Sequence, residues 1–194
     1  MTKIYNILIV GIGGQGVIKM GKFFQNYAME HPNISSFTAL ESRGVSQREG
    51  SVIASVRYLL KTEKKAQEDE IFISGFPPKG RVDLLIALEG LEFYRYISYC
   101  RPDGAALVNR NQILPKSARS QRIELLINED SHIETIQQEL PSLNLNLKNF
   151  TLELSQLPAP RPYLNQYILK YLGDLNIPLF PTDELEKSVK NFFG

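Results

Sequence analysis

This sequence has few cysteines and histidines and almost no net charge. Each of these features argues against a class of function. The single cysteine, Cys100, can form no internal disulfide and is too few to hold an iron–sulfur cluster or a structural zinc ion. The 22 lysines and arginines almost balance the 21 acidic residues, which leaves a formal net charge of +1. No long-range field therefore favours nucleic acid or an anionic membrane as the main partner.

Long apolar runs are absent as well. No stretch approaches the roughly 20 residues that a membrane span requires, and the first residues lack the basic segment, apolar run and cleavage site of an export signal. We therefore expect a cytoplasmic protein. Of the 194 residues, 43% are hydrophobic and 22% are charged, as in a globular chain, so we expect one domain over residues 1–194.

No residue set for nucleophilic catalysis is visible. The two histidines, His31 and His132, have no serine, cysteine or acid arranged around them, and we expect both at the surface. Cys100 follows an apolar, aromatic segment and is expected to be buried or half-buried, without a nucleophilic role. We assign no catalytic residue and no metal ligand, and expect the chain to lack a complete catalytic centre.

Hydrophobic periodicity predicts alternating strands and helices. Strands are expected at residues 4–10, 34–41, 51–60, 82–88, 105–109, 123–127 and 150–154. Helices are expected from Val17, after the glycines, to near His31-Pro32, and at 89–100, 131–140, 163–172 and 182–193, the last with Thr182 as its N-cap. The charged residues 61–70 indicate a solvated turn or hairpin tip, and Pro102-Asp103-Gly104 indicates a turn. Pro158, Pro160 and Pro162 interrupt regular structure before the helix at 163–172.

This order predicts an α/β fold, a three-layer sandwich whose mixed, mainly parallel sheet opens with a Rossmann-like strand, glycine loop and helix. The helices from about residue 162 are expected to pack on this domain or on a partner.

A glycine-rich loop joins the first strand to the first helix. Gly11-Ile12-Gly13-Gly14-Gln15-Gly16 has the spacing G-x-G-x-x-G in the context that gives this motif meaning. Glycines allow positive φ and close approach of main-chain N–H groups to a phosphate, and the helix N-terminus favours an anion. The alternative is a tight turn without a ligand, although four glycines in six residues are more than a turn needs.

A second polar cluster follows the second strand. Residues 41–51 hold two arginines, two glutamates, a glutamine and three serines. If strands 4–10 and 34–41 run parallel, this cluster leaves the sheet at the same edge as the glycine loop, where ligands of α/β sheets bind. Arg43 and Arg48 could then bind anionic groups bidentately, and Gly44 would allow the backbone to approach the ligand closely. The alternative is a surface hairpin with its arginines in water or paired to Glu41 and Glu49.

The predicted cofactor-binding residues are therefore Gly11, Gly13, Gly14, Gln15, Gly16, Glu41, Arg43, Gly44, Gln47, Arg48 and Ser51. For a nicotinamide dinucleotide, Glu41, twenty-five positions after Gly16, could hold the ribose hydroxyls. A Rossmann half would next form a crossover helix, whereas a nine-residue polar loop, residues 42–50, leads directly into strand 51–60.

Three stretches, residues 6–16, 41–51 and 82–89 with Pro102-Asp103-Gly104 and Val108-Asn109 after it, resemble the gamma-type subunit or domain of 2-oxoacid:ferredoxin (acceptor) oxidoreductases. The likeness is greatest to the beta-subunit type of indolepyruvate ferredoxin oxidoreductase. It spans about residues 4–115, with a weaker echo at Asn165 and Leu172-Gly173. Two departures are Glu49, where the family has a glycine, and the segment from Pro158 to Pro162.

The resemblance implies oxidative decarboxylation of a 2-oxoacid, of the indolepyruvate or arylpyruvate type or another such as pyruvate, to acyl-CoA with electrons passed to ferredoxin. Thiamine diphosphate with Mg and the iron–sulfur clusters would belong to a larger partner subunit. This chain would contact coenzyme A, whose phosphates suit the glycine loop and arginines, and close the active site. Alone it would be inactive and could form a homodimer. Two alternatives stay open, namely a free-standing NAD(P)- or nucleotide-binding Rossmann-like protein and a non-catalytic assembly module.

Overall fold

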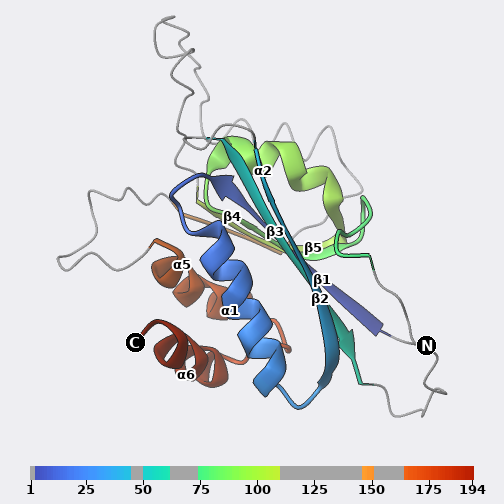
Figure 1. Cartoon of the computed structure of the whole chain (residues 1–194), viewed down its shortest axis with the longest axis vertical. Coiled ribbons are helices and arrows are strands. Elements are labelled where there is room, and N and C mark those ends of the chain that lie inside the picture. Colours follow the sequence, from blue (N-terminus) through green and yellow to red (C-terminus); the bar gives the residue numbers. More distant parts are fainter. Residues whose placement is uncertain (1–2, 45–49, 62–73, 110–145, 151–163) are drawn as a thin grey trace, which may run out of the picture.

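The computed structural model describes residues 3–44, 50–61, 74–109, 146–150 and 164–194 (Figure 1). The elements in chain order are β1 (Lys3–Ile12), α1 (Val17–Glu30), β2 (Ile34–Arg43), β3 (Ser51–Leu60), β4 (Val82–Ala87), α2 (Gly90–Tyr96), the 3₁₀ turn η1 (Ile97–Tyr99), β5 (Cys100–Asn109), β6 (Asn146–Phe150), α5 (Leu164–Leu172), the 3₁₀ turn η3 (Gly173–Leu175) and α6 (Thr182–Phe193).

One six-stranded sheet organises these elements, in the order β2-β3-β1-β4-β5-β6. The pairs β1–β4, β4–β5 and β5–β6 are parallel, whereas β3 is antiparallel to both of its neighbours, β1 and β2. Strands β1 and β2 therefore run in the same direction with β3 between them. The predicted mixed, mainly parallel sheet is confirmed.

Helices cover both faces of the sheet, which confirms the predicted three layers (Figure 1). Along β1, Ile7 and Ile9 face α1, α5 and α6, while Leu8 and Val10 face α2 and η1. Side chains alternate between faces in a strand, so a strand buried on both sides must be apolar throughout. The run Ile7-Leu8-Ile9-Val10 meets this requirement.

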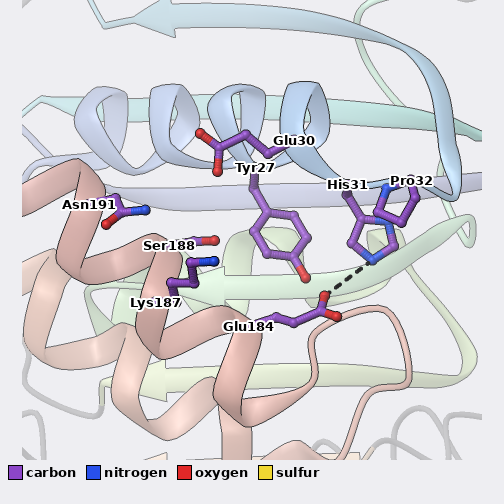
Figure 2. A pocket seen from close by; sticks show the side chains of 8 residues that line it. All are labelled: Tyr27, Glu30, His31, Pro32, Glu184, Lys187, Ser188 and Asn191. Carbon is purple, nitrogen blue, oxygen red and sulfur yellow. Dashed lines mark ion pairs between the residues drawn. The ribbon is translucent and has the colours of Figure 1, made fainter.

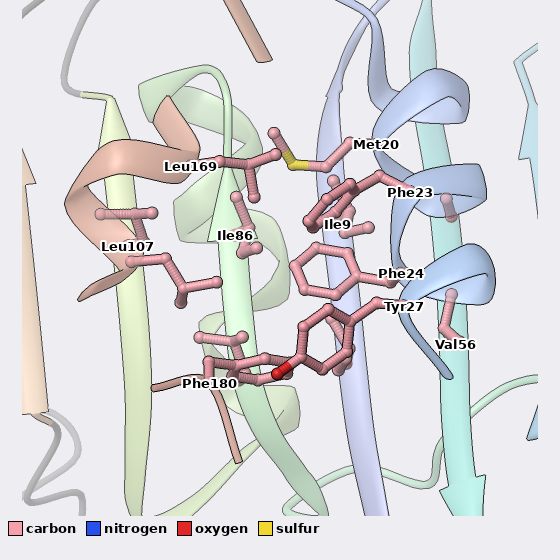
Figure 3. Packing of buried hydrophobic residues seen from close by; sticks show 14 of the residues in the cluster. Ile9, Met20, Phe23, Phe24, Tyr27, Val56, Ile86, Leu107, Leu169 and Phe180 are labelled. Atoms are coloured by element: carbon pink, nitrogen blue, oxygen red, sulfur yellow. The ribbon is translucent and has the colours of Figure 1, made fainter. Parts of the chain in front are cut away.

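The first helix supplies much of the core on its side. Met20, Phe24 and Tyr27 lie at three- and four-residue spacing and pack on β1 and β4, together with Leu169 of α5 and Phe180 (Figure 3). The Tyr58 hydroxyl of β3 donates to the Phe24 carbonyl oxygen at 2.6 Å. Burying one such aromatic or aliphatic side chain typically contributes about 1.5–3 kcal/mol, so this cluster fixes α1, and with it the glycine loop, against the sheet.

Three predictions of secondary structure need correction. The turn at Pro102-Asp103-Gly104 is an irregularity inside β5, whose pairing with β4 shifts between Val82↔Cys100 and Leu84↔Ala105. The helix after β4 ends at Tyr96, earlier than predicted, and continues as a 3₁₀ turn.

The third correction concerns the start of α6, which lies one residue away from the predicted position. Pro181 occupies the N-cap of α6 and Thr182 is the first helical residue, so no side-chain cap forms. The Thr182 side chain packs beside Gly173, where a Cβ would lie 3.1 Å from its Oγ1 atom. Tertiary packing thus decides how this helix begins.

Other predictions fall outside the described residues. These are residues 62–70 of the charged segment, the strand at 123–127, the helix at 131–140, His132, residues 151–154 of the predicted strand at 150–154, and Pro158, Pro160 and Pro162. Within the described part of the chain, no helix has the length and apolar content needed to cross a membrane.

Candidate functional site

The glycine loop turns from β1 into α1 through two residues with left-handed backbone. Gly14 has a φ of 95° and Gly16 a φ of 87°, a region that side chains with a Cβ rarely enter. Gly16 is the N-cap of α1 and has no side chain to cap the first turn. Among the described residues, no atom would lie within 4 Å of a Cβ on Gly14. The loop therefore presents bare main chain at the mouth of a fourteen-residue helix.

Gln15 holds this loop to the centre of the sheet. Its Oε1 atom accepts a hydrogen bond from the Ile12 amide at 2.9 Å, and its Nε2 atom donates to the Leu88 carbonyl oxygen at 3.1 Å. The Nδ2 atom of Asn109 donates to the same oxygen at 3.3 Å. Both polar atoms of the Gln15 side chain thus bind main-chain groups of the protein. A contact between Gln15 and a ligand stays a prediction.

The connection between β2 and β3 lies beside the glycine loop. The Gly13 amide donates to the Gly50 carbonyl oxygen at 3.0 Å, and Ile12 pairs with Ser51 at the start of β3. The Gly44 amide closes the base of the connection by donating to the Ser51 carbonyl oxygen at 2.8 Å. The predicted meeting of the two loops at one sheet edge is confirmed.

Of the second polar cluster, residues 41–51, the structure describes 41–44, 50 and 51. Glu41 and Arg43 are exposed on β2, which is separated from β1 by β3. Gln47 and Arg48 lie outside the described residues. Adjacent strands are about 4.8 Å apart, so Glu41 stands roughly 10 Å from the strand that carries the glycine loop. In a Rossmann half the ribose-binding acid follows the strand next to the first.

Two buried acids that the sequence prediction missed support the same edge from the α2 side. Glu89 caps α2 by accepting from the Glu92 amide at 2.8 Å. Glu92 in turn accepts from the Ser51 hydroxyl and from the Arg95 guanidinium, each at 2.7 Å. The signal available in the sequence was the position of Glu89 directly after an apolar strand.

Asn165 joins the C-terminal helices to the glycine loop. Its side chain is 1% exposed, and its Nδ2 atom donates to the Gly16 carbonyl oxygen at 3.3 Å. A Cβ on Gly16 would lie 2.8 Å from that Nδ2 atom, so the approach requires glycine. Helix α5 is therefore part of the support of the loop.

A separate cavity of about 270 Å³ lies at the other end of α1 (Figure 2). It is lined by Tyr27, Glu30, His31, Pro32, Glu184, Lys187, Ser188 and Asn191. The His31 side chain, predicted at the surface, is only 6% exposed, because its ring packs on Tyr27. Its Nδ1 atom accepts from the Asn33 amide, and its Nε2 atom lies 3.8 Å from the Glu184 carboxylate. Across the described residues, no group of three His, Cys, Asp or Glu side chains is arranged to hold a metal ion.

Comparison with known proteins gives a family match over nearly the whole chain. Residues 6–194 match the family described as pyruvate ferredoxin/flavodoxin oxidoreductase. The indolepyruvate oxidoreductase subunit IorB of Pyrococcus horikoshii is 33% identical over 113 residues, which are 58% of this chain and 50% of that protein. The same subunit of Thermococcus kodakarensis is 32% identical over 122 residues, with the same two shares. The chain spans about half the length of the curated relatives it matches.

Solved structures share the fold. Pyruvate oxidoreductase subunit PORC from Thermotoga maritima superposes with a TM-score of 0.55 at 15% identity, over 99% of this chain and 86% of that one. The gamma subunit of a keto/oxoacid ferredoxin oxidoreductase from Geobacter sulfurreducens gives 0.53 at 18% identity, over 96% and 85%. The 2-oxoglutarate:ferredoxin oxidoreductase of Magnetococcus marinus, solved with 2-oxoglutarate, coenzyme A and succinyl-CoA bound, gives 0.54 at 15% identity, over 100% of this chain and 28% of that one.

Proposed function

Because this chain belongs to the pyruvate ferredoxin/flavodoxin oxidoreductase family, we propose that it is a subunit of a 2-oxoacid:ferredoxin oxidoreductase and binds coenzyme A at its glycine-loop edge. The observation that carries the binding site is the hydrogen bond from the Gly13 amide to the Gly50 carbonyl oxygen, at 3.0 Å. It brings the loop at the start of α1 next to the connection between β2 and β3, which begins directly after Arg43. A phosphorylated ligand at this place would accept hydrogen bonds from the amides of the first turn of α1 and from the Arg43 guanidinium group.

Coenzyme A suits this edge by its charges. Its pyrophosphate would lie at the first turn of α1, where Gly14 has open space around it among the described residues and the N-cap Gly16 provides no side-chain cap. Arg43, exposed at the end of β2, would meet the remaining phosphate, and Arg48 would add a second cation. The residues present thus fit the anionic half of the molecule.

The overall reaction would convert a 2-oxoacid and coenzyme A into an acyl-CoA and carbon dioxide, with two electrons passing to ferredoxin and the thiol proton of coenzyme A released. Thiamine diphosphate with Mg would supply the decarboxylation chemistry and iron–sulfur clusters the electron path, both in a larger partner subunit. The one cysteine of this chain is buried and cannot hold a cluster. This chain would close the shared active site and would be inactive alone.

The substrate would be an indolepyruvate-type or other aryl 2-oxoacid, on the strength of the similarity to IorB subunits. We propose that residues 1–194 act as one domain in this assembly, in the cytoplasm. The nicotinamide alternative is weakened by β3, which separates Glu41 from β1. A non-catalytic assembly module would also use this edge, but only for protein contacts.

The test is kinetic, on the complex of this chain co-purified with its larger partner. Arg43→Ala should raise the KM for coenzyme A about tenfold, the equivalent of roughly 1.4 kcal/mol, and leave the KM for the 2-oxoacid unchanged. Arg81→Ala is the matched control. Arg81 is also exposed, but it precedes β4 and so lies at the amino ends of the parallel strands, away from the glycine loop.

Calorimetry separates the alternatives. The complex should bind coenzyme A and give no heat with NAD or NADP. NAD binding without a response to coenzyme A would favour the nucleotide-binding protein. Full activity and an unchanged KM in Arg43→Ala and in Arg48→Ala would favour the assembly module.

A further inference from the structure

Strand β2 leaves one long edge of the sheet open. Within the described residues, β3 is the strand that pairs with β2, and the order of the sheet places β2 at its margin. From Ser36 to Arg43 the pairing with β3 runs without a break, so the backbone along this stretch is regular. A regular edge presents a row of N–H and C=O groups that a further strand can bind.

Several of the devices that proteins use to protect such an edge are missing from β2 itself. Strand β2 spans ten residues, Ile34–Arg43, and contains neither proline nor lysine. Its only irregularity lies at the beginning, between Ile34 and Ser36. Leu40, in the middle of the regular stretch, is 39% exposed and is one of two large hydrophobic residues described as exposed. A long, regular edge strand without proline or lysine and with an exposed leucine at its centre indicates a docking strand.

We infer that β2 pairs with β2 of a second copy of this chain, antiparallel and centred on Leu40, so that two sheets join into one. The register follows from the sequence of the strand. A two-fold axis at Leu40 places the two leucines opposite each other and buries the exposed apolar surface of both. It also places Thr38 opposite Ser42, where hydroxyl groups can hydrogen-bond across the strands.

The charges of the strand agree with this register. The two charged residues of β2 are Glu41 and Arg43. Around Leu40, Glu41 lies opposite Ala39 of the other copy and Arg43 opposite Phe37, so no like charges face each other directly. The formal net charge of +1 per chain adds little long-range repulsion between copies.

Sedimentation of the purified full chain over a dilution series tests the assembly. The wild-type chain should reach the mass of a dimer as concentration rises, and Leu40→Lys should remain a monomer, because a lysine on the axis places two ammonium groups together. Met29→Lys is the matched control: Met29 is the other exposed large hydrophobic residue, 70% exposed on α1, and its variant should still dimerise. Far-ultraviolet circular dichroism checks that both variants fold.

Disulfide trapping tests the register. Directly opposed residues in an antiparallel pair lie about 4.5–5.5 Å apart between Cα atoms, within the range that a disulfide spans. Leu40→Cys should oxidise to a covalent dimer, whereas Glu41→Cys, which faces Ala39, and Met29→Cys should not. The native Cys100 is buried and does not interfere. A wild-type chain that stays monomeric at every concentration, a dimeric Leu40→Lys variant, or equal trapping at all three positions overturns the inference.

Discussion

Gln15 fills the space that a side chain on Gly11 would need. A Cβ placed on Gly11 would lie 2.7 Å from the Oε1 atom of Gln15. Because Gly11 has no Cβ, the Gln15 side chain folds back over the end of β1 and reaches both the Ile12 amide and the Leu88 carbonyl oxygen. The first glycine of the motif therefore makes room for the glutamine, while Gly14 and Gly16 shape the exposed part of the loop.

Gly11→Ala should destabilise the chain by about 1–3 kcal/mol, because the new methyl group would also crowd Val17 and Leu88. Urea unfolding measures this loss. Gly14→Ala is the comparison, since its Cβ would meet no atom of the described residues within 4 Å, while the φ of 95° opposes the substitution. That variant should lose about 1–2 kcal/mol. Wild-type stability in Gly11→Ala would contradict the packing described here.

Gln15→Glu should lower stability at neutral pH by about 1–3 kcal/mol, because a carboxylate would face the Leu88 carbonyl oxygen in place of a donor. At low pH the protonated carboxyl group can donate again, so the difference from the wild-type chain should shrink. Unfolding curves at several pH values measure both effects. Asn26→Asp, at an exposed amide beside Glu30, should change stability by no more than about 0.5 kcal/mol.

Cys100 should react slowly with thiol reagents in the folded chain. Burial raises the pKa of its thiol to about 12, so very little thiolate is present at neutral pH. Labelling with a disulfide reagent should become fast only when urea unfolds the chain. The exposed thiol of Met29→Cys provides the fast reference under native conditions, and equal native rates for the two thiols would contradict the burial of Cys100.

Asp83 should make stability depend on pH in a defined direction. Burial raises the pKa of its carboxyl group above the ordinary 3.8, against the hydrogen bond from the Asn6 amide and the charge of Arg101, which lower it. For a raised pKa, the contribution to stability is complete below 3.8 and is lost as the pH rises through the higher pKa of the folded state.

Asp83→Asn lacks this titration, so its stability relative to the wild-type chain should improve as the pH rises through that window. Denaturant unfolding over a pH series gives the measurement. Arg101→Ala should extend the pH-dependent loss to higher pH, because the neighbouring positive charge is removed. A wild-type curve parallel to that of Asp83→Asn would remove Asp83 as the cause.

Local patterns in the sequence were sufficient for most strands and for α1. The run at Ile7-Leu8-Ile9-Val10 and the spacing of Met20, Phe23 and Tyr27 report burial directly, since each depends only on the period of one element. The meeting of the two loops followed from strand direction, and Gly13 and Gly50 confirm it.

Contacts between distant parts of the chain were beyond such patterns. The insertion of β3 between β1 and β2 depends on strand pairing, which the local period does not encode. The same holds for His31, polar in sequence yet buried against Tyr27, and for Glu92, which acquires its partner Ser51 only in the folded sheet. The hydrogen bond from the Gln15 side chain could not be predicted locally either, because its acceptor, the Leu88 carbonyl oxygen, is 73 positions away.

The hydrogen bond from Asn165 to Gly16 spans 149 positions of sequence. During synthesis the first strand and the glycine loop emerge long before the asparagine that braces them, and chains grow at about 5–20 residues per second. A nascent or truncated chain that stops short of α5 must therefore carry an unbraced loop. The proposed coenzyme A site would therefore be complete only after α5 has been synthesised and has packed against the loop.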